Sequence, residues 1–125
     1  MIDGLFNQPS YLAAKKTLDA VALRQDALAS NIANLETPGY KRIDLAPSFQ
    51  TELARASAAG DASQISELQP TLAQDTTATA VGPDGNNVSL ENEMLQMNQN
   101  TLLQTLETQL VSNNLSKMRL AITGR

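Results

Sequence analysis

The 125-residue chain contains no cysteine, no histidine and no tryptophan. Without cysteine it can form no disulfide and no thiolate nucleophile, and without histidine it lacks the commonest general base and metal ligand. It also has no glycine-rich loop followed by lysine, the pattern that binds phosphates. We therefore expect no enzymatic activity, no cofactor, no bound metal and no small-molecule substrate.

Aromatic residues are scarce, with two Phe and two Tyr in the whole chain. Aromatic side chains supply the largest buried area per residue. The apolar content is instead mostly alanine and leucine, which favour long helices over a thick globular core. We expect a chain of marginal stability that gains stability by meeting partners.

Long apolar runs and basic clusters are missing as well. No stretch reaches the roughly 18 apolar residues of a membrane span, and the N-terminus lacks the basic and apolar regions of a cleavable signal peptide. The net charge is −4, and its acidic excess falls within residues 46–89. With no basic stripe, nucleic acid is excluded as a partner. We expect a chain that is either cytosolic or exported without a cleaved signal.

The sequence predicts an all-α fold in three segments. Residues 1–45 hold a helix, an Asn-rich motif and a turn, 46–88 form a variable and mostly irregular connection, and 89–125 form a second long helix. The first helix is predicted over 9–35, with proline at its first position and a Thr-Pro-Gly turn after it. Its apolar seam has heptad spacing: Tyr11, Ala14, Leu18, Val21, Leu28, Ile32 and Leu35, interrupted by Gln25.

The second helix is predicted to begin after Ser89, with acids in its first turn, and to end near Gly124. At 100° per residue its apolar side chains form two opposite faces. One face holds Leu95, Leu102, Leu103, Leu106, Leu110 and Leu120, and the other holds Leu90, Met94, Met97, Val111, Leu115, Met118 and Ile122.

The chain has no third long helix, so only one of these two faces can pack on the first helix. We predict an antiparallel coiled hairpin of two helices whose remaining face forms an interface with other subunits. The alternative is a monomeric bundle with the middle segment folded over it. The predicted helix interface comprises Leu18, Val21, Leu28, Leu102, Leu106, Leu110, Val111, Leu115, Met118 and Ile122.

The middle segment is rich in Ala, Ser, Thr, Gln, Gly and Asp. A short helix fits residues 49–56, but from residue 58 to 87 the apolar side chains Ile65, Leu68, Leu72 and Val81 stand isolated. We predict a mobile loop or a weak pair of strands over most of this stretch.

The most specific pattern lies at residues 28–40. Small side chains in it permit close approach of another backbone, and two asparagine amides can bond carbonyls near the helix end. Whether the two asparagines and the tyrosine contact a partner or only their own chain stays open. The residues of this predicted assembly motif are Ser30, Asn31, Ile32, Ala33, Asn34, Thr37, Pro38, Gly39 and Tyr40.

This motif resembles the signature of the bacterial flagellar rod and hook family of axial proteins, whose members also place a long helix at each terminus. Three further segments, at 22–25, 41–45 and 84–91, are similar to those of the proximal rod subunits in that family. Ser89 departs from the acidic residue usual there. The resemblance covers 1–50 and 84–125 and says little about the residues between.

The resemblance implies a structural subunit of the proximal rod that polymerises through its terminal helices into the torque-transmitting drive shaft of the basal body, in the periplasmic space. Implied partners are copies of itself, other rod subunits, the basal-body adaptor FliE, the inner-membrane ring and the flagellar type III export apparatus, which exports such subunits without a cleaved signal. The alternatives are the second proximal rod protein of the same family and a soluble helical interaction module.

Overall fold

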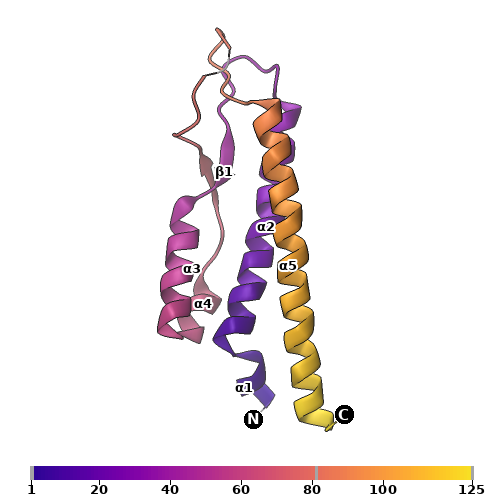
Figure 1. The fold of residues 1–125 in the computed structure, drawn as a ribbon. Helices are drawn as coiled ribbons and strands as arrows, with labels where there is room; N and C mark the ends of the chain where they lie inside the picture. Colours follow the sequence, from indigo (N-terminus) through magenta and orange to yellow (C-terminus); the bar gives the residue numbers. More distant parts are fainter. Residues whose placement is uncertain (1, 81, 125) are drawn as a thin grey trace.

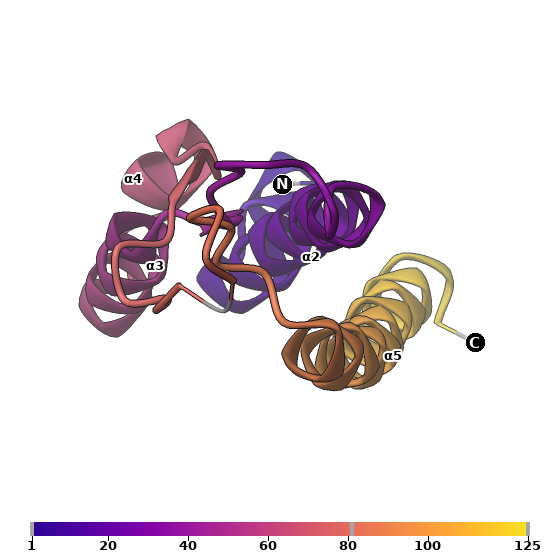
Figure 2. The ribbon, with the colours of Figure 1, turned by 90° about the horizontal axis from the view of Figure 1, so that it is seen from above.

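A computed structural model describes residues 2–80 and 82–124 of the chain, and most of these are helical. The two longest elements are α2 (Pro9–Ala33) and α5 (Leu90–Thr123). They run antiparallel and side by side, and α5 extends past the start of α2 (Figures 1 and 2). The predicted all-α hairpin of N- and C-terminal helices is confirmed.

The ends of these helices follow local sequence signals. Proline occupies the first turn of α2, where its missing N–H costs nothing. Ser89 precedes α5 as predicted, although its side chain makes no capping hydrogen bond. Gly124, with φ of 70°, ends α5 in the left-handed conformation that glycine adopts freely.

A short helix that the sequence analysis did not predict, α1 (Ile2–Phe6), precedes α2. The Phe6 ring meets the Tyr11 ring edge to face, with centroids 6.4 Å apart. This contact fixes α1 against the first turn of α2.

The middle segment contains more regular structure than predicted. Its elements are β1 (Ile43–Leu45), α3 (Pro47–Ala59), α4 (Ala62–Glu67) and β2 (Leu72–Gln74). The two strands pair antiparallel with Asp44 opposite Ala73. Helices α3 and α4 pack on α2 on the side away from α5 (Figure 2).

The extra order comes from a few contacts that sequence spacing did not reveal. Phe49, Ala56 and Ile65 are buried between α3, α4 and α2. Gly60 permits the turn between the two helices with a φ of 66°, and Asp61 caps α4 by accepting a hydrogen bond from the Gln64 N–H. Ile65 looked isolated in the sequence but is fully buried because α4 turns it back onto α2.

The core is thin and unusually polar. The largest side chains with less than 2% exposure are Leu28, Ile65, Glu93, Asn31 and Asn100. Three of these five are polar, so hydrogen bonds and ion pairs share the closing of the hairpin with apolar packing. Within the described residues, no helix is both long and apolar enough to span a membrane.

Candidate functional site

Asn31 is the centre of the junction where α2 ends and α5 begins. Its amide nitrogen donates to the Ile43 carbonyl (2.8 Å) and to Glu93 Oε2 (3.0 Å). Its amide oxygen accepts from the Ile43 N–H (3.0 Å) and from the Tyr40 hydroxyl (3.2 Å). One fully buried amide therefore joins α2, β1 and α5, with all of its hydrogen-bonding capacity used.

Five charged side chains surround this amide, and we call them the charge cluster: Arg24, Arg42, Asp44, Asp75 and Glu93. Arg42 is at its centre. Its guanidinium lies 2.5 Å from Glu93 Oε1, 2.9 Å from Asp44 Oδ2 and 2.8 Å from Asp75 Oδ2.

Arg24 on α2 completes the charge cluster. It bonds both carboxylate oxygens of Asp44 and donates to Gln96 of α5 at 2.6 Å. Removing one member of such a buried group leaves the others uncompensated, so the charge cluster specifies how β1 and β2 sit against the hairpin.

The pairing shifts the acid–base equilibria of the charge cluster. Burial alone would lower the pKa of Arg42, but hydrogen bonds to Glu93 and Asp44 outweigh it and raise that pKa. Burial opposes ionisation of Asp44, yet hydrogen bonds from Arg24, the Leu45 N–H and Arg42 hold its pKa below the ordinary value. Hydrogen bonds from Thr77 and Arg42 lower the pKa of Asp75. All three groups are therefore charged at neutral pH.

Two consecutive asparagines before α5 close the same end of the molecule. The Asn86 amide nitrogen lies 2.9–3.0 Å from the carbonyls of Asn34, Leu35 and Thr37, which follow the last turn of α2. The Asn87 amide oxygen accepts from the Arg42 N–H at 2.6 Å. These bonds satisfy carbonyls that a helix end otherwise leaves without partners.

The predicted assembly motif is thus divided between an internal and an exposed part. Asn31, Asn34 and Tyr40 bond within their own chain, which supports the intramolecular alternative for these three residues. Ser30 and Ile32 are half-buried. The remaining residues, Ala33, Thr37, Pro38 and Gly39, are exposed at the tip of the hairpin. A role of the motif in contacts between subunits stays a prediction.

Asn100 provides a second polar contact, halfway along the hairpin. It is 1% exposed, and its amide nitrogen donates to the Val21 carbonyl (3.0 Å) and to Gln25 Oε1 (2.9 Å). Among the residues that the structure describes, its amide oxygen has no hydrogen-bond partner. A single buried amide in a helical seam fixes the register of the two helices, and Gln25, the polar break in the predicted seam, is the side chain that it meets.

The face that α5 turns toward α2 is not one of the two predicted apolar faces. Its more buried positions are Glu93, Gln96, Met97, Asn100, Leu103, Glu107, Val111, Asn114 and Met118. At 100° per residue this line runs between the centres of the two predicted faces. It includes Leu103 from the edge of the first face and Met97, Val111 and Met118 from the second. The expectation that one leucine face packs on the first helix is therefore corrected, because polar contacts to α2 select the line between them.

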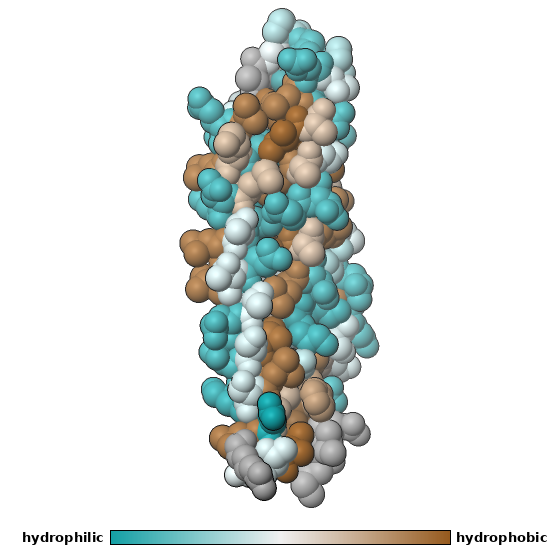
Figure 3. Space-filling model, turned by 90° about the vertical axis from the view of Figure 1, so that its right-hand side faces the viewer, coloured by the Kyte–Doolittle hydropathy of each residue, from teal (hydrophilic) through white to brown (hydrophobic). Residues whose placement is uncertain are grey.

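Of the predicted interface, Val21, Leu28 and Met118 are buried within the chain, and Leu18 and Val111 are half-buried. The three leucines of α5 in the predicted interface that belong to its first face lie outside the contact between the two helices. Leu102 is 62% exposed, Leu106 56% and Leu110 50%. Leu115 and Ile122 are exposed on the other flank. Apolar side chains recur from top to bottom on the side of the molecule where α5 lies (Figure 3).

Comparison with known proteins identifies the family to which this chain belongs. Residues 12–41 match the family model described as flagella basal body rod protein. The flagellar basal body rod protein FlgB of Escherichia coli K12 is 31% identical over 120 residues, covering 83% of this chain and 86% of that protein. The chain belongs to the FlgB family of basal body rod proteins.

Other FlgB proteins agree over nearly their full length. FlgB of Borrelia hermsii is 29% identical, covering 87% of this chain and 92% of that protein. FlgB of Salmonella typhimurium is also 29% identical, covering 88% and 90%. At these coverages the matches to the FlgB relatives reach into both long helices, whereas the family model covers most of α2 and the turn after it. The chain is a structural rod protein and not an enzyme.

Sequence analysis missed most of the polar contacts within the chain. Arg42, Asn86, Glu93 and Asn100 gave no motif of their own. A signal did exist for two of them, because Glu93 and Asn100 are seven residues apart and so lie on one helical face. That face holds few apolar residues, and the analysis followed the leucines instead.

Proposed function

We propose that the chain is a structural subunit of the proximal flagellar rod and packs against other rod subunits and copies of itself through the outer flanks of α5. The observation that carries this proposal is the separation of polar and apolar residues on α5. Its polar residues close the hairpin, and its leucines face outward. We call Leu95, Leu102, Leu106 and Leu110 the first flank and Leu90, Met94, Leu115 and Ile122 the second flank.

Both flanks are too apolar to remain in water in the working state. Each member is between 42% and 62% exposed in the single chain. Burying such area gains roughly 25 cal/mol per Å², and an apolar stripe of this length on a soluble chain is a mark of an interface.

The two flanks consist of different residues on different sides of the helix. A contact that joins the first flank of one subunit to the second flank of another is heterologous, and heterologous contacts build open-ended helical assemblies. This arrangement suits a rod better than a closed dimer.

The same proposal names further partners at the base of the rod and during export. We infer that the chain meets the adaptor FliE and the inner-membrane ring at the base of the rod, in the periplasmic space. We further infer that it passes unfolded through the flagellar export apparatus without a cleaved signal. The absence of cysteine and the thin, polar core support this, because such a hairpin opens at little cost.

The proposal also gives the assembly motif two tasks. Asn31 and Asn34 hold the end of α2 through internal hydrogen bonds. The exposed turn at Thr37, Pro38 and Gly39 is then presented in a fixed orientation to neighbouring subunits.

The test measures incorporation into the rod. Basal bodies are purified from the source bacterium, and this chain is quantified by peptide mass spectrometry against the inner-membrane ring protein. We expect a small, constant number of copies for the unaltered chain and at least a ten-fold loss for the double variant Leu102→Asn with Leu106→Asn. The matched control, Thr105→Asn, changes an exposed position between them without removing apolar area.

The variants must also fold as monomers. Because both leucines are exposed, we expect the double variant to retain the helical circular dichroism of the unaltered chain and its free energy of unfolding within about 0.5 kcal/mol. Normal incorporation of the double variant would contradict the role of the first flank. Absence of the unaltered chain from basal bodies would contradict the proposed function itself.

A further inference from the structure

The two ends of the hairpin carry charge of opposite sign. At the tip, where α2 ends and α5 begins, Glu36, Asp84 and Glu91 are exposed acids. The exposed base there is Lys41, whose ammonium donates to the Gly85 carbonyl at 2.6 Å. At the other end, no acidic residue follows Glu107 in the described part of α5.

The free end of α5 is basic and apolar together. Lys117 and Arg119 are exposed, and among the described residues neither forms an ion pair. Leu120 is 54% exposed and Ile122 51%. The last two turns therefore present aliphatic side chains beside two unpaired cations.

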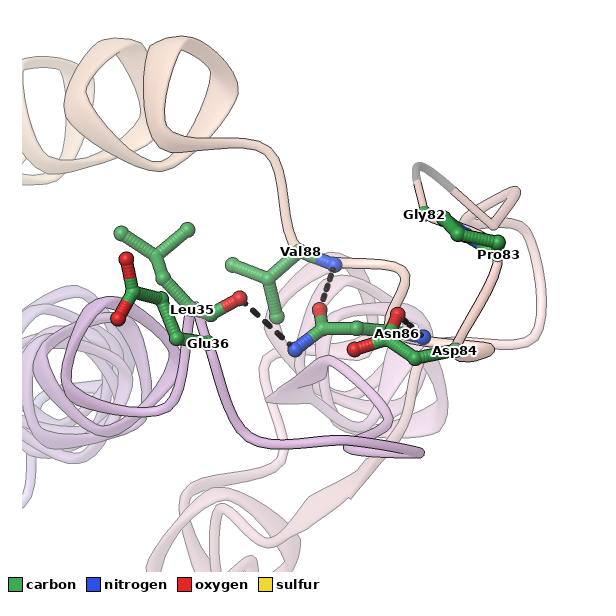
Figure 4. Close-up of a pocket in the computed structure, with 7 residues that line it drawn as sticks. All are labelled: Leu35, Glu36, Gly82, Pro83, Asp84, Asn86 and Val88. Carbon is green, nitrogen blue, oxygen red and sulfur yellow. Dashed lines mark hydrogen bonds between the residues drawn. The ribbon is translucent and has the colours of Figure 1, made fainter.

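The tip holds a groove with the reverse character. It has a volume of about 440 Å³ and is lined by Leu35, Glu36, Gly82, Pro83, Asp84, Asn86 and Val88. Leu35 and Glu36 lie on one side and Asp84 and Asn86 on the other, with Val88 between them (Figure 4). The groove thus combines two aliphatic side chains with two carboxylates.

The polar groups of the groove are partly occupied inside the chain. The Asn86 amide is used by its bonds to carbonyls of the segment after α2 and to the Val88 N–H. Asp84 accepts from the Asn86 N–H through one oxygen, and Glu36 has no bonding partner among the described residues. Since a 150 Å³ apolar cavity admits a benzene ring, this groove has room for an aliphatic side chain with a cation beside it.

We propose that the last two turns of α5 of one copy dock in the tip groove of a second copy. Leu120, which belongs to neither flank, would enter between Leu35 and Val88, and Arg119 would meet Glu36 and Asp84. The inference rests on the proposed function and adds a contact along the rod axis to the lateral contacts of the leucine flanks.

We assign the occupant to a second copy because the two surfaces are complementary in charge and lie at opposite ends of one molecule. Helix α5 has 34 residues, which makes it about 50 Å long at 1.5 Å per residue. The groove and the free end of the same chain therefore cannot meet. Matching acidic and basic surfaces guide such a contact and set its orientation, while the aliphatic side chains hold it.

The end-to-end arrangement can be tested by disulfide cross-linking, which would join successive copies into a ladder of oligomers. The chain has no cysteine, so the variant with Pro83→Cys and Ala121→Cys carries one thiol at each end. The ends are too far apart for a bond within one chain, since bonded cysteines need Cα atoms within about 7 Å. On oxidation of the concentrated protein we expect a ladder of oligomers, and dimers at most from either single-cysteine variant.

Charge reversal in the same two-cysteine background tests the chemistry. Glu36→Lys and Arg119→Glu should each lower the yield of the ladder at least five-fold at low salt, because like charges then face each other. The two reversals together should restore the yield to within two-fold. The control Glu67→Lys makes the same charge change on α4, away from both surfaces, and should leave the yield unchanged.

The outcomes separate the two proposals. A ladder that ignores Glu36→Lys, or that the second reversal does not restore, overturns the end-to-end contact. So does a chain that is present in purified basal bodies but forms no ladder. Absence of the unaltered chain from basal bodies overturns the proposed rod function, whatever the ladder shows.

Discussion

At the scale of single residues, side-chain amides hold this molecule closed. Asn31, Asn86 and Asn100 each bridge segments far apart in the sequence. A primary amide both donates and accepts, so one buried side chain can satisfy a backbone carbonyl and a carboxylate at once. No aliphatic side chain can replace these contacts without leaving their partners unsatisfied.

Asn31→Asp should be strongly destabilising although it preserves shape. The variant loses the amide donor and places a carboxylate 3.0 Å from Glu93. We expect the free energy of unfolding at pH 7 to fall by about 2–4 kcal/mol, measured by urea denaturation. Asn98→Asp, an exposed position on α5, is the control and should change it by less than about 0.5 kcal/mol. Equal stability of the two variants would refute the central place of Asn31.

At the scale of elements, the charge cluster holds β1 against α2 and α5, and its contribution to stability depends on pH. The carboxylates of Asp44 and Asp75 have lowered pKa values in the folded chain. Folding therefore gains stability from them above their unfolded pKa of about 4 and loses that gain as the pH falls through the lower folded values. Strand β1 should detach from α2 first on acidification.

Asp44→Asn should reveal this pH dependence. At pH 7 we expect a loss of about 2 kcal/mol, because the hydrogen bonds to Arg24 and Arg42 weaken. Below about pH 4 the difference from the unaltered chain should begin to shrink, because Asp44 of the unfolded chain is then becoming protonated, and it should vanish below the lowered pKa of the folded Asp44. Thermal unfolding across pH 3–7 measures both limbs, and a difference that stays constant with pH would contradict the assignment.

Glu107, which lies between α5 and α2, has a pKa shifted in the opposite direction from those of Asp44 and Asp75. It is half-buried, forms no ion pair within the described residues, and burial raises its pKa. A raised folded pKa makes the ionised form a penalty that is present at neutral pH and vanishes on protonation. Glu107→Gln should stabilise the chain by up to about 0.5 kcal/mol at pH 7 and leave it unchanged at pH 3. Glu52→Gln, an exposed acid on α3, should have no effect at either pH.

The scale of elements also shows how far sequence reasoning reached. Helical periodicity and the end signals of α2 and α5 predicted both long helices nearly to the residue, because Pro9, Ser89 and Gly124 act locally. The motif at 28–40 located the junction. The charge cluster could not be predicted, because Arg42 and Glu93 are 51 residues apart and charged residues are normally solvated. The seam of α5 was misjudged because one of the two apolar faces was expected to pack on the first helix, whereas the buried line runs between their centres.

For the whole molecule, the hairpin should be firm at its tip and loose at its base. The charge cluster and Asn86 bind the first turns of α5, while its last turns lie beyond the start of α2 (Figure 1). We expect amide hydrogens of residues 111–123 to exchange at least ten-fold faster than those of 93–103 in the isolated chain, measured by mass spectrometry. Uniform protection along α5 would contradict this gradient.

Helices α3 and α4 lie on the far side of α2 from α5. The chain should therefore tolerate insertions between α3 and α4 better than insertions near the charge cluster. Residues inserted at the turn around Gly60 would extend away from both leucine flanks and from the tip groove. The same number inserted between Tyr40 and Asp44 would shift Arg42 out of the charge cluster. Epitope tags or fluorescent labels for imaging the rod therefore belong at Gly60, and related genes should vary in length there while keeping the spacing from Asn31 to Arg42 constant.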